Sequence, residues 1–391
     1  MTTLILKSGR ERSLNNKHPW LFSGAVKQLP QAETGEIVRV TDNHGNTLAY
    51  GFFDSKSEIT CKLFEFSTDD SLIFDQAYWT NKITVAFQLR QQTVLKGDTN
   101  CCRLIHAEGD GLPGLIVDVY AAVAVAQVLH KGIEMIFPQI LNALNGLGIK
   151  SVYTKTKTSS KHIENLEMPS QWHGQVSEMP IEVTENGLKF RIDMETGQKT
   201  GFFIDQRENR QLLQSYSEGK AVLNTFSYTG GFSVYAAAGG AVKIDSVDIS
   251  KPAVEACSEN MVLNFPDFKN HRSIAADCFD YLKHMETEYD IIVLDPPAFA
   301  KNAHAVKNAT RGYKEINLMA FKKIKPGGVL FTFSCSKNID RVLFRKIIFG
   351  AAADSGRDVK ILHQLTQPPD HPVSIYHPEG EYLKGLVLWV A

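Results

Sequence analysis

Residues 221–248 of this chain read AVLNTFSYTGGFSVYAAAGGAVKIDSVD. Its first apolar run leads into a turn that closes on Gly230 and Gly231, and a segment of small apolar residues follows. A second apolar run ends directly before Asp248. The order predicts a strand, a glycine turn, a helix, a second strand and an acid, which is the plan of a nucleotide-type site.

The glycine turn and the acid indicate the kind of ligand. Glycines allow backbone N–H groups to approach a ligand closely, and a carboxylate after the second strand accepts hydrogen bonds from a ribose. The turn does not read G-x-G-x-x-G, which argues against a dinucleotide and a nicotinamide-dependent oxidoreductase. It suits an adenosyl ligand that lacks a pyrophosphate, although an ordinary strand–helix–strand turn without a ligand has the same pattern.

The composition is that of a globular protein with several domains. The chain has 391 residues, 43% of them hydrophobic, and this length corresponds to two or three domains of roughly 100–200 residues. No apolar run approaches the roughly 18 residues of a membrane span, and the N-terminus lacks a signal-peptide pattern, so we expect a cytoplasmic protein without a membrane partner. None of the six cysteines forms a C-x-x-C pair, so the sequence predicts no metal site.

Positive charge is concentrated in two stretches, although the net charge of the chain is only −1. The first stretch, residues 7–27, has Glu11 as its single acid and contains Lys7, Arg10, Arg12, Lys17 and Lys27. The second, residues 300–325, has Glu315 as its single acid and contains Lys301, Lys307, Arg311, Lys314, Lys322, Lys323 and Lys325. Such clusters fit a selective nucleic-acid surface, and solvated faces of ordinary elements are the alternative.

Residues 1–66 alternate short apolar runs with turns, which predicts a small β-barrel. The pair Gly9-Arg10 and the run WLFSGA at 20–25 make this part resemble a PUA domain. The resemblance implies an RNA-binding barrel in residues 1–70. Residues 71–180 then form a small central α+β domain, with a helix at 74–95, a glycine turn at 103–115, a hairpin of 116–120 with 122–129, a helix at 133–144 and a strand at 151–155.

Strand and helix signals alternate through the remaining part, residues 181–391, after a hairpin predicted by Asn186-Gly187. The expected strands are 221–226, 242–247, 273–276, 291–294, 329–333, 359–362 and 386–390. The expected helices are 232–238, 252–265, 279–285, 313–324 and 341–355. This alternation predicts a doubly wound α/β sheet with helices on both faces.

Polar or unusual residues follow five consecutive predicted strands, at the edge where function collects in doubly wound sheets. The first strand precedes the glycine turn, and the second precedes Asp248. The next three strands lead into Asp277-Cys278-Phe279, Asp295-Pro296-Pro297-Ala298-Phe299 and Ser334-Cys335-Ser336. Together, these five strand ends indicate a site more strongly than any single motif.

Residues 199–386 contain the motifs KTGFFIDQRENR, LNTFSYTGGFSVYAA, SVDIS, DCFDYL, LDPPAFAK, RGYKEINLMA, FTFSCS, PPDHP and YLKGL. This set resembles class I S-adenosylmethionine-dependent methyltransferases, whose domain is Rossmann-like. It is most similar to the bacterial large-subunit rRNA cytosine-C5 methyltransferases with an N-terminal PUA domain. The resemblance spans nearly the whole chain and implies S-adenosylmethionine as cofactor, large-subunit rRNA as partner and 5-methylcytosine as product.

The resemblance also implies which residues bind the cofactor. Asp248 would bind the ribose hydroxyls, and Asp277 with Cys278 would border the adenine. The first strand end would line the methionine part, and the segment after Lys199 would close over the cofactor. The full predicted set is Thr200, Gly201, Phe203, Asp205, Arg207, Phe226, Tyr228, Thr229, Gly230, Gly231, Asp248, Ile249, Asp277, Cys278 and Asp295.

Asp295 begins a rigid turn whose two prolines aim the acid and the following carbonyl groups into the site. In a cytosine-C5 enzyme, Asp295 would protonate or hydrogen-bond N3 of the base. In a guanine N-methyltransferase, which is the alternative, Asp295 would hold an exocyclic amine and Phe299 would stack on the base. We expect the substrate contacts to be Phe299, Lys301 and Arg311, and a plain strand-ending turn is the remaining alternative.

Cys335 distinguishes a cytosine-C5 methyltransferase, which needs a nucleophilic thiol, from a guanine N-methyltransferase. Cytosine C5 is too weak a nucleophile to attack a sulfonium methyl group until a thiolate has added at C6. A strand-end cysteine can lie across the base from the cofactor, so we expect Cys335 to be this nucleophile, with a buried packing thiol as the alternative. The resemblance puts Ala298 where many RNA C5 methyltransferases carry a second, product-releasing cysteine.

The target base must be unpaired or flipped to reach such a site. We expect the barrel, residues 300–325 and Arg207 with Arg210 to hold the RNA backbone. An RNA-binding assembly factor without activity would keep the same cofactor fold. The sequence does not identify the target nucleotide or the base that removes the C5 proton. It also leaves open whether the substrate is naked rRNA or an assembled subunit, and whether the protein forms a homodimer.

Overall fold

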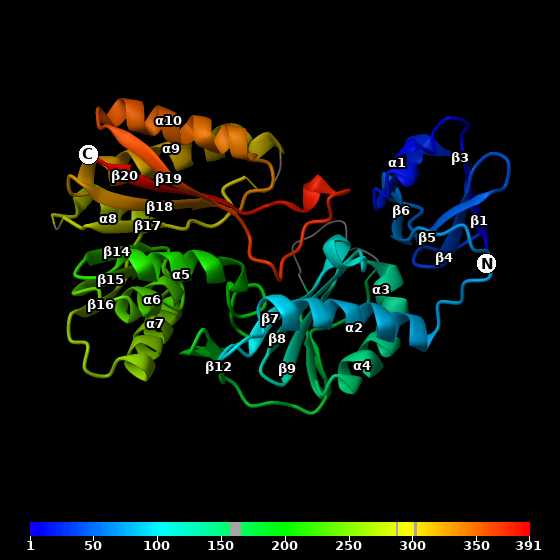
Figure 1. Ribbon diagram of the computed structural model, residues 1–391, viewed down its shortest axis with the longest axis horizontal. Helices are drawn as coiled ribbons and strands as arrows, with labels where there is room; N and C mark the ends of the chain where they lie inside the picture. The colour runs from blue at the N-terminus through cyan, green and yellow to red at the C-terminus, as the bar shows by residue number, and fades with distance from the viewer. Residues whose placement is uncertain (157–165, 287, 301–302) are drawn as a thin grey trace. The chain divides into compact units, whose positions relative to one another are not determined.

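The computed structural model describes residues 1–156, 166–286, 288–300 and 303–391 (Figure 1). Its internal contacts divide the chain into two units. The first unit consists of residues 1–183, 192–204 and 369–380, and the second of residues 184–191, 205–368 and 381–391. The domain boundaries expected at residues 70 and 180 stay a prediction.

The second unit is built on a seven-stranded sheet with the strand order β16-β15-β14-β17-β18-β20-β19. Strands β14 to β18 run parallel to their neighbours in this group, and β20 runs antiparallel between β18 and β19. The strands are β14 (Ala221–Thr225), β15 (Lys243–Asp248), β16 (His271–Ala275), β17 (Ile291–Leu294), β18 (Gly328–Ser334), β19 (Val359–Leu365) and β20 (Lys384–Val390). The α/β sheet predicted from the sequence is confirmed.

Helices cover both faces of this sheet, with α5, α6 and α7 on one face and α8, α9 and α10 on the other (Figure 1). Three of them begin after a capping oxygen, from Ser250, Asp277 and Asp340. The helices are α5 (Arg207–Tyr216), α6 (Gly231–Ala238), α7 (Lys251–Asn264), α8 (Cys278–His284), α9 (Val306–Lys323) and α10 (Arg341–Ser355). Because both faces are covered, central strands such as β17, with the sequence IIVL, are buried throughout.

The first unit contains two sheets. A six-stranded mixed sheet has the order β2-β6-β5-β4-β1-β3, and a five-stranded sheet has the order β11-β10-β9-β8-β7. The first sheet consists of β1 (Thr3–Leu6), β2 (Trp20–Phe22), β3 (Val26–Gln28), β4 (Ile37–Thr41), β5 (Thr47–Phe53) and β6 (Ile59–Glu65). The second consists of β7 (Cys101–His106), β8 (Leu115–Tyr120), β9 (Val123–Val128), β10 (Ser151–Thr154) and β11 (Gln171–Gly174).

Among the described residues of the first unit, these sheets are accompanied by the helices α1 (Arg12–Asn15), α2 (Gln76–Thr93), α3 (Lys131–Met135) and α4 (Phe137–Gly146). Phe52 and Phe64 of the six-stranded sheet pack on Trp79 of α2, which joins the two sheets through one apolar core. The predicted Asn-Gly hairpin forms between β12 (Ile181–Glu185) and β13 (Leu188–Ile192). In the described part of the chain, no helix has the length and apolar character needed to cross a bilayer.

The helix expected at 313–324 begins earlier, at Val306. Gly312 conceals this start in the sequence, because glycine in a helix interior is unfavourable by roughly 0.5–1 kcal/mol relative to alanine. In the structure, a Cβ on Gly312 would lie 3.3 Å from the ring of Phe299. The glycine therefore allows this ring to pack directly on α9.

Two expectations in the central part of the chain are also wrong. The stretch 103–115 is not a turn throughout, because β7 occupies its first residues and pairs antiparallel with β8. The single helix expected at 133–144 is divided into α3 and α4, with Pro138 in the first turn of α4. Proline has no N–H group to continue a helix from the preceding turn, so it fits only at such a start.

Candidate active site

The turn after β14 has an unusual backbone. Phe226 (φ 54°), Tyr228 (φ 48°) and Gly230 (φ 82°) all have positive φ angles, which cost free energy for residues other than glycine. The N–H of Ser227 donates to the carbonyl oxygen of Val247 at 3.0 Å and ties the turn to β15. Backbone strain of this kind gathers at ligand sites, so the turn is a candidate cofactor loop.

Gly230 makes room for this turn. A Cβ at this position would lie 2.5 Å from the Sγ of Cys257 on α7, which is too close for any side chain. Gly230 is the N-cap of α6, and Gly231 is the first residue of that helix. Because the N–H groups of a first helical turn have no partner within the helix, they form a cradle for polar ligand atoms.

Asp248 lies beside the glycine turn at the end of β15. Its Oδ2 accepts a hydrogen bond from the N–H of Tyr228 and its Oδ1 from the N–H of Ser250, each at 2.9 Å. These bonds fix the carboxylate, and each oxygen keeps a further lone pair that a ribose hydroxyl can use. Ile249, which we also expected at the cofactor, is 72% exposed.

Asp277 and Cys278 stabilise the next strand end. The Oδ1 of Asp277 accepts from the N–H groups of Phe279 and Asp280 at 2.9 and 3.1 Å and caps α8. Cys278 is buried, and its Sγ accepts from the N–H of Phe226 at 3.2 Å. Burial raises the pKa of Cys278 to about 12, so this thiol stays neutral while it holds the candidate cofactor loop at Phe226.

Two buried polar atoms at the first strand end have no hydrogen-bond partner among the described residues. They are the Oδ1 of Asn224 and the Oγ of Ser227. Since buried polar atoms are normally hydrogen-bonded, this pair indicates a polar ligand at the turn. With the glycine cradle and the carboxylate of Asp248, these atoms fit the ribose and amino-acid parts of S-adenosylmethionine.

Cys335 and Asp295 come together because β17 and β18 are parallel neighbours, with Leu294 opposite Thr332. The Sγ of Cys335 lies 4.0 Å from the carbonyl oxygen of Pro296. The Oδ1 of Asp295 accepts a hydrogen bond from the Nε2 of Gln206 at 3.0 Å. A thiol, a carboxyl group and an orienting amide therefore share one region of the second unit.

Cys335 differs from the other cysteines in exposure. Five of the six are buried, and Cys335 is partly exposed. Burial raises the pKa of the Cys61 and Cys257 thiols, which keeps them protonated and inert. A nucleophile must reach its substrate, so exposure singles out Cys335.

The predicted cofactor residues from Thr200 to Arg207, at the start of α5, fall in both units. Asp205 and Arg207 belong to the second unit, and the first contains Thr200, Gly201 and Phe203. Within the first unit, the hydroxyl of Thr200 donates to the Oδ2 of Asp118 at 2.5 Å. Within the second, Asp205 accepts from the hydroxyl of Tyr382 at 2.8 Å. The cofactor role of these five residues stays a prediction.

Arg207 and Arg210 do not face solvent, so the expectation that they hold an RNA backbone is wrong. Both side chains are only 2% exposed and surround the carboxylate of Glu185. The Nη2 of Arg210 donates to both oxygens of this carboxylate at 2.7 and 2.8 Å, and the Nε of Arg207 lies 3.4 Å from one of them. These cations neutralise a buried acid of the β12–β13 hairpin.

The three predicted substrate residues are Phe299, Lys301 and Arg311, and the two that the structure describes differ in their exposure to solvent. The ring of Phe299 packs on Tyr313, with 4.6 Å between the ring centroids, and Arg311 is exposed on α9. Lys301 lies outside the described residues. Three lysines of the basic stretch 300–325 already have partners: Lys314 pairs with Asp354, Lys323 with the Met285 carbonyl and Lys325 with Asp290. Of the described cations in this stretch, Lys307, Arg311 and Lys322 are exposed.

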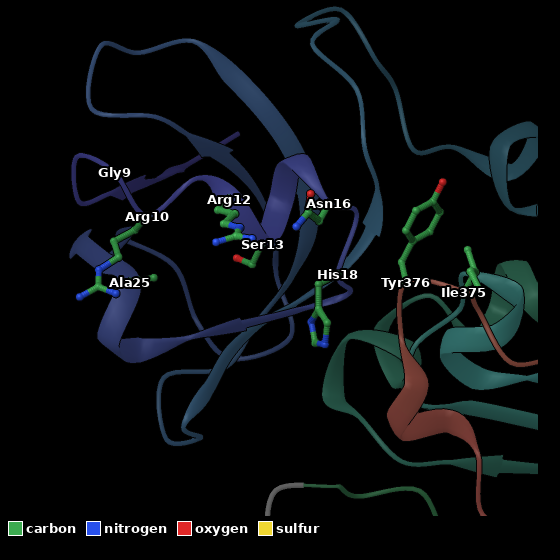
Figure 2. Close-up of a pocket in the computed structure, with 9 residues that line it drawn as sticks. All are labelled: Gly9, Arg10, Arg12, Ser13, Asn16, His18, Ala25, Ile375 and Tyr376. Carbon is green, nitrogen blue, oxygen red and sulfur yellow. The ribbon is translucent and has the colours of Figure 1, made fainter.

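The first unit has an open pocket of about 650 Å³ at the N-terminal basic cluster (Figure 2). The residues that line it include Arg10 and Arg12, which follow β1 of the six-stranded sheet, and Ile375 and Tyr376 of segment 369–380. The Nζ of Lys17 lies 5.9 Å from the centroid of the half-exposed Tyr376 ring. Cations beside an exposed aromatic ring are the combination that binds single-stranded nucleic acid.

The motifs KTGFFIDQRENR and YLKGL contain Gln206 and Lys384, for which the sequence predicts no role. Gln206 contacts Asp295, as described above, and Lys384 donates its Nζ to the carbonyl oxygen of Ser336 at 2.7 Å. Their positions follow from packing between distant segments, so no local signal could have identified them. Over the described residues, no group of three or more His, Cys, Asp and Glu side chains could hold a metal ion.

Comparisons with known proteins agree with this arrangement. A family model described as S-adenosylmethionine-dependent methyltransferase matches residues 154–384, and one described as PUA-like domain matches residues 4–66. The relatives named ribosomal RNA large subunit methyltransferase I include proteins from Aeromonas salmonicida, 39% identical with 98% of both chains covered, and Cronobacter sakazakii, 38% identical with 99% of both chains covered.

Two solved structures share the fold over 100% of both chains. One is a methyltransferase complexed with SAH (TM-score 0.86, 24% identity), and the other is a SAM-dependent methyltransferase from Streptococcus mutans (TM-score 0.84, 23% identity). The chain belongs to the S-adenosylmethionine-dependent methyltransferases with an N-terminal PUA-like domain, the family of these large-subunit methyltransferase relatives.

Proposed function

We propose that this protein methylates carbon 5 of a cytosine in large-subunit ribosomal RNA, with S-adenosylmethionine as the methyl donor and Cys335 as the nucleophile. The name shared by the relatives supports ribosomal RNA as the substrate. The observation that carries the cytosine proposal is the partly exposed thiol of Cys335, 4.0 Å from the carbonyl oxygen of Pro296 in the turn that Asp295 begins.

The proposed cofactor contacts in the second unit are the cradle at Gly230 and the carboxylate of Asp248. When bound, S-adenosylmethionine supplies the methyl group that C5 accepts. The Cys335 thiolate forms a bond to C6 of the cytosine, and the C5=C6 electron pair moves toward N3, where Asp295 holds the proton. C5 is then electron-rich enough to be methylated. Solvent water then takes the C5 proton, whose electron pair re-forms the C5=C6 bond and expels the Cys335 thiolate, and the proton at N3 returns to Asp295.

Gln206 supports the proposed role of Asp295. Its amide donates to the Oδ1 of Asp295 at 3.0 Å, which fixes the orientation of the carboxyl group. A fixed carboxyl group can meet N3 without a cost for rotation in the transition state. The hydrogen bond therefore favours a specific catalytic geometry over a plain strand-ending turn.

The pocket of the first unit supports an RNA-holding role for the PUA-like domain. Arg10 and Arg12 are exposed, and no ion pair or hydrogen bond in the described part of the chain engages their side chains. Free guanidinium groups can bind phosphate oxygens in a bidentate manner. The ring of Tyr376 offers a surface on which an unpaired base can stack.

The mechanism is tested by replacing the nucleophile and by trapping it. We expect Cys335→Ala protein to bind S-adenosylmethionine normally and to lose turnover, because C5 cannot be activated without a thiolate. Wild-type protein should form a covalent adduct with RNA that carries 5-fluorocytosine at the target, since fluorine cannot leave as a proton does. Cys61→Ala is the control, because it removes a buried thiol of the first unit.

The alternative, guanine N-methylation, makes opposite predictions for the same experiment. Cys335→Ala protein would stay active, and no fluorocytosine adduct would form. A fully active Cys335→Ala enzyme would therefore falsify the cytosine mechanism and leave the methyltransferase family assignment standing. An inactive assembly factor would show neither turnover nor an adduct in the wild-type protein.

A further inference from the structure

A buried lysine lies next to the segment that carries the proposed nucleophile. Lys384 is the first residue of β20, and the register of β18 and β20 pairs it with Ser334. Its Nζ donates to the carbonyl oxygen of Ser336 at 2.7 Å, and only 4% of the residue is exposed. Lys384 is thus held next to residues 334–336, whose middle residue is Cys335.

The nearby carboxylates are engaged elsewhere. Glu381 accepts from the Nε of Arg341 at 2.6 Å, and Asp340 accepts from the N–H of Leu343 at 2.7 Å as the cap of α10. No ion pair in the described part of the chain includes Lys384. An ammonium group removed from water is unfavourable unless an opposite charge compensates it.

We propose that the Lys384 ammonium group stabilises the thiolate of Cys335, so that the two side chains form an ion pair during the reaction. The inference rests on the proposed role of Cys335 as the nucleophile. When the thiolate forms, the S–H bond of Cys335 breaks, the proton passes to solvent water, and the electron pair stays on sulfur. Lys384 acts through the thiol and is therefore a positioning residue.

The charges around Lys384 agree with this pairing. Burial lowers the pKa of its ammonium group to about 8, and ionised Cys335 raises it. Glu381 and Asp340 also raise this pKa, while Arg341 lowers it. Since pH 7 lies below this pKa, Lys384 is mainly charged there, and a thiolate beside it stabilises that charge.

Tyr313 also faces this segment, because its hydroxyl lies 3.0 Å from the Oγ of Ser336. Burial raises the pKa of Tyr313, so its phenol stays neutral at pH 7 and adds no charge beside the thiol. Tyr313 therefore does not ionise in the pH range in which the Cys335 thiol is expected to ionise. The reactivity of the Cys335 thiol should then report the effect of Lys384 directly.

The experiment measures alkylation of Cys335 by iodoacetamide as a function of pH, read by mass spectrometry of the peptide that contains it. In Lys384→Met protein, we expect the midpoint of reactivity to rise by about one pH unit and the rate at pH 7 to fall about tenfold. Lys384→Arg retains the positive charge and should keep most of the reactivity.

Lys323→Met is a matched control. The Nζ of Lys323 also donates to a backbone carbonyl oxygen, that of Met285 at 2.9 Å, but it takes no part in the proposed site. This variant should leave the alkylation midpoint of Cys335 unchanged. An equal rise in both variants would overturn the proposal, because it would reflect the loss of any lysine that donates to a backbone carbonyl oxygen.

An unchanged midpoint in folded Lys384→Met protein with normal S-adenosylmethionine affinity would overturn the proposal. Wild-type protein provides a second test that does not depend on the folding of a variant. A wild-type midpoint at or above the value of about 8.5 for an ordinary cysteine would also overturn it. Alkylation does not require turnover, so these outcomes are distinct from the Cys335→Ala result, which tests the proposed function.

Discussion

The hydrogen bond from the Nε2 of Gln206 to the Oδ1 of Asp295 helps to orient the carboxyl group of the proposed site. Gln206 is buried, and its Oε1 in turn accepts from the Nδ2 of Asn209 at 2.6 Å. This chain of hydrogen bonds fixes which end of the Gln206 amide faces Asp295. A change at Gln206 should therefore act on the orientation of Asp295 and not on the cofactor cradle.

We predict that Gln206→Leu lowers kcat at least tenfold and leaves S-adenosylmethionine affinity unchanged. A hydrogen bond to a charged group contributes about 1.5–3 kcal/mol, and about 1.4 kcal/mol corresponds to a tenfold change in rate. Single-turnover kinetics and calorimetry would measure the two effects. Gln211→Leu, at an exposed position of the following helix α5, is the control. An unchanged kcat would show that Asp295 needs no support from Gln206.

Among the helices and strands, the junction of β14 and α6 forms the proposed cofactor loop. Gly230 has to satisfy two conditions there, a positive φ angle and contact with Cys257. Alanine would meet neither condition, because its Cβ disfavours positive φ and would press on the Sγ of Cys257. A bulkier residue would disturb the packing of α7 as well, so alanine is the more informative substitution.

We predict that Gly230→Ala weakens S-adenosylmethionine binding at least tenfold, as measured by calorimetry. Gly219→Ala is the matched control, because Gly219 also has a positive φ angle, of 66°, but no atom lies within 4 Å of the position of its Cβ. The control should lose about 1 kcal/mol of stability and keep its affinity. Equal losses of affinity in both variants would contradict the assignment of the loop.

At the scale of the whole molecule, the chain returns to the first unit late in its sequence. Segment 369–380, which follows β19, belongs to that unit and contributes Tyr376 to the pocket beside Arg10 and Arg12. The Nη2 of Arg90 and the N–H of Arg103 anchor the segment through the backbone and side chain of Asp370, at 2.8 and 3.0 Å. The pocket therefore depends on residues from both ends of the sequence.

We predict that the double variant Arg10→Ser, Arg12→Ser weakens binding of the rRNA fragment and lowers its dependence on salt. Each lost phosphate contact should reduce the slope of log affinity against log salt by about 0.7 for a single strand. The control, Lys56→Ser with Lys96→Ser, removes the same charge at exposed positions outside the pocket. Equal slopes in the two double variants would show that the pocket does not hold RNA, and S-adenosylmethionine affinity should stay unchanged in both.

Local patterns determined much of this protein. The apolar runs fixed the strands of the second unit to within a few residues, and the Asn186-Gly187 turn fixed a hairpin, because backbone preference and burial act over neighbouring residues. The same patterns predicted the proposed cofactor loop, Asp248 and Cys335 as site residues, because parallel strands direct their carboxyl ends to one edge of a sheet. These features depend on the order of residues along the chain and on little else.

Tertiary structure decided the features that depend on distant partners. Arg207 and Arg210 look like RNA contacts in the sequence, but they neutralise Glu185, whose position follows only from packing. The insertion of β20 between β18 and β19 brings Lys384 to the Cys335 segment. An apolar run has the same sequence pattern whether its strand lies at the edge of a sheet or between two other strands. A charged residue likewise does not show in the sequence which residue it will pair with. Pairings between distant residues therefore had to come from the folded structure.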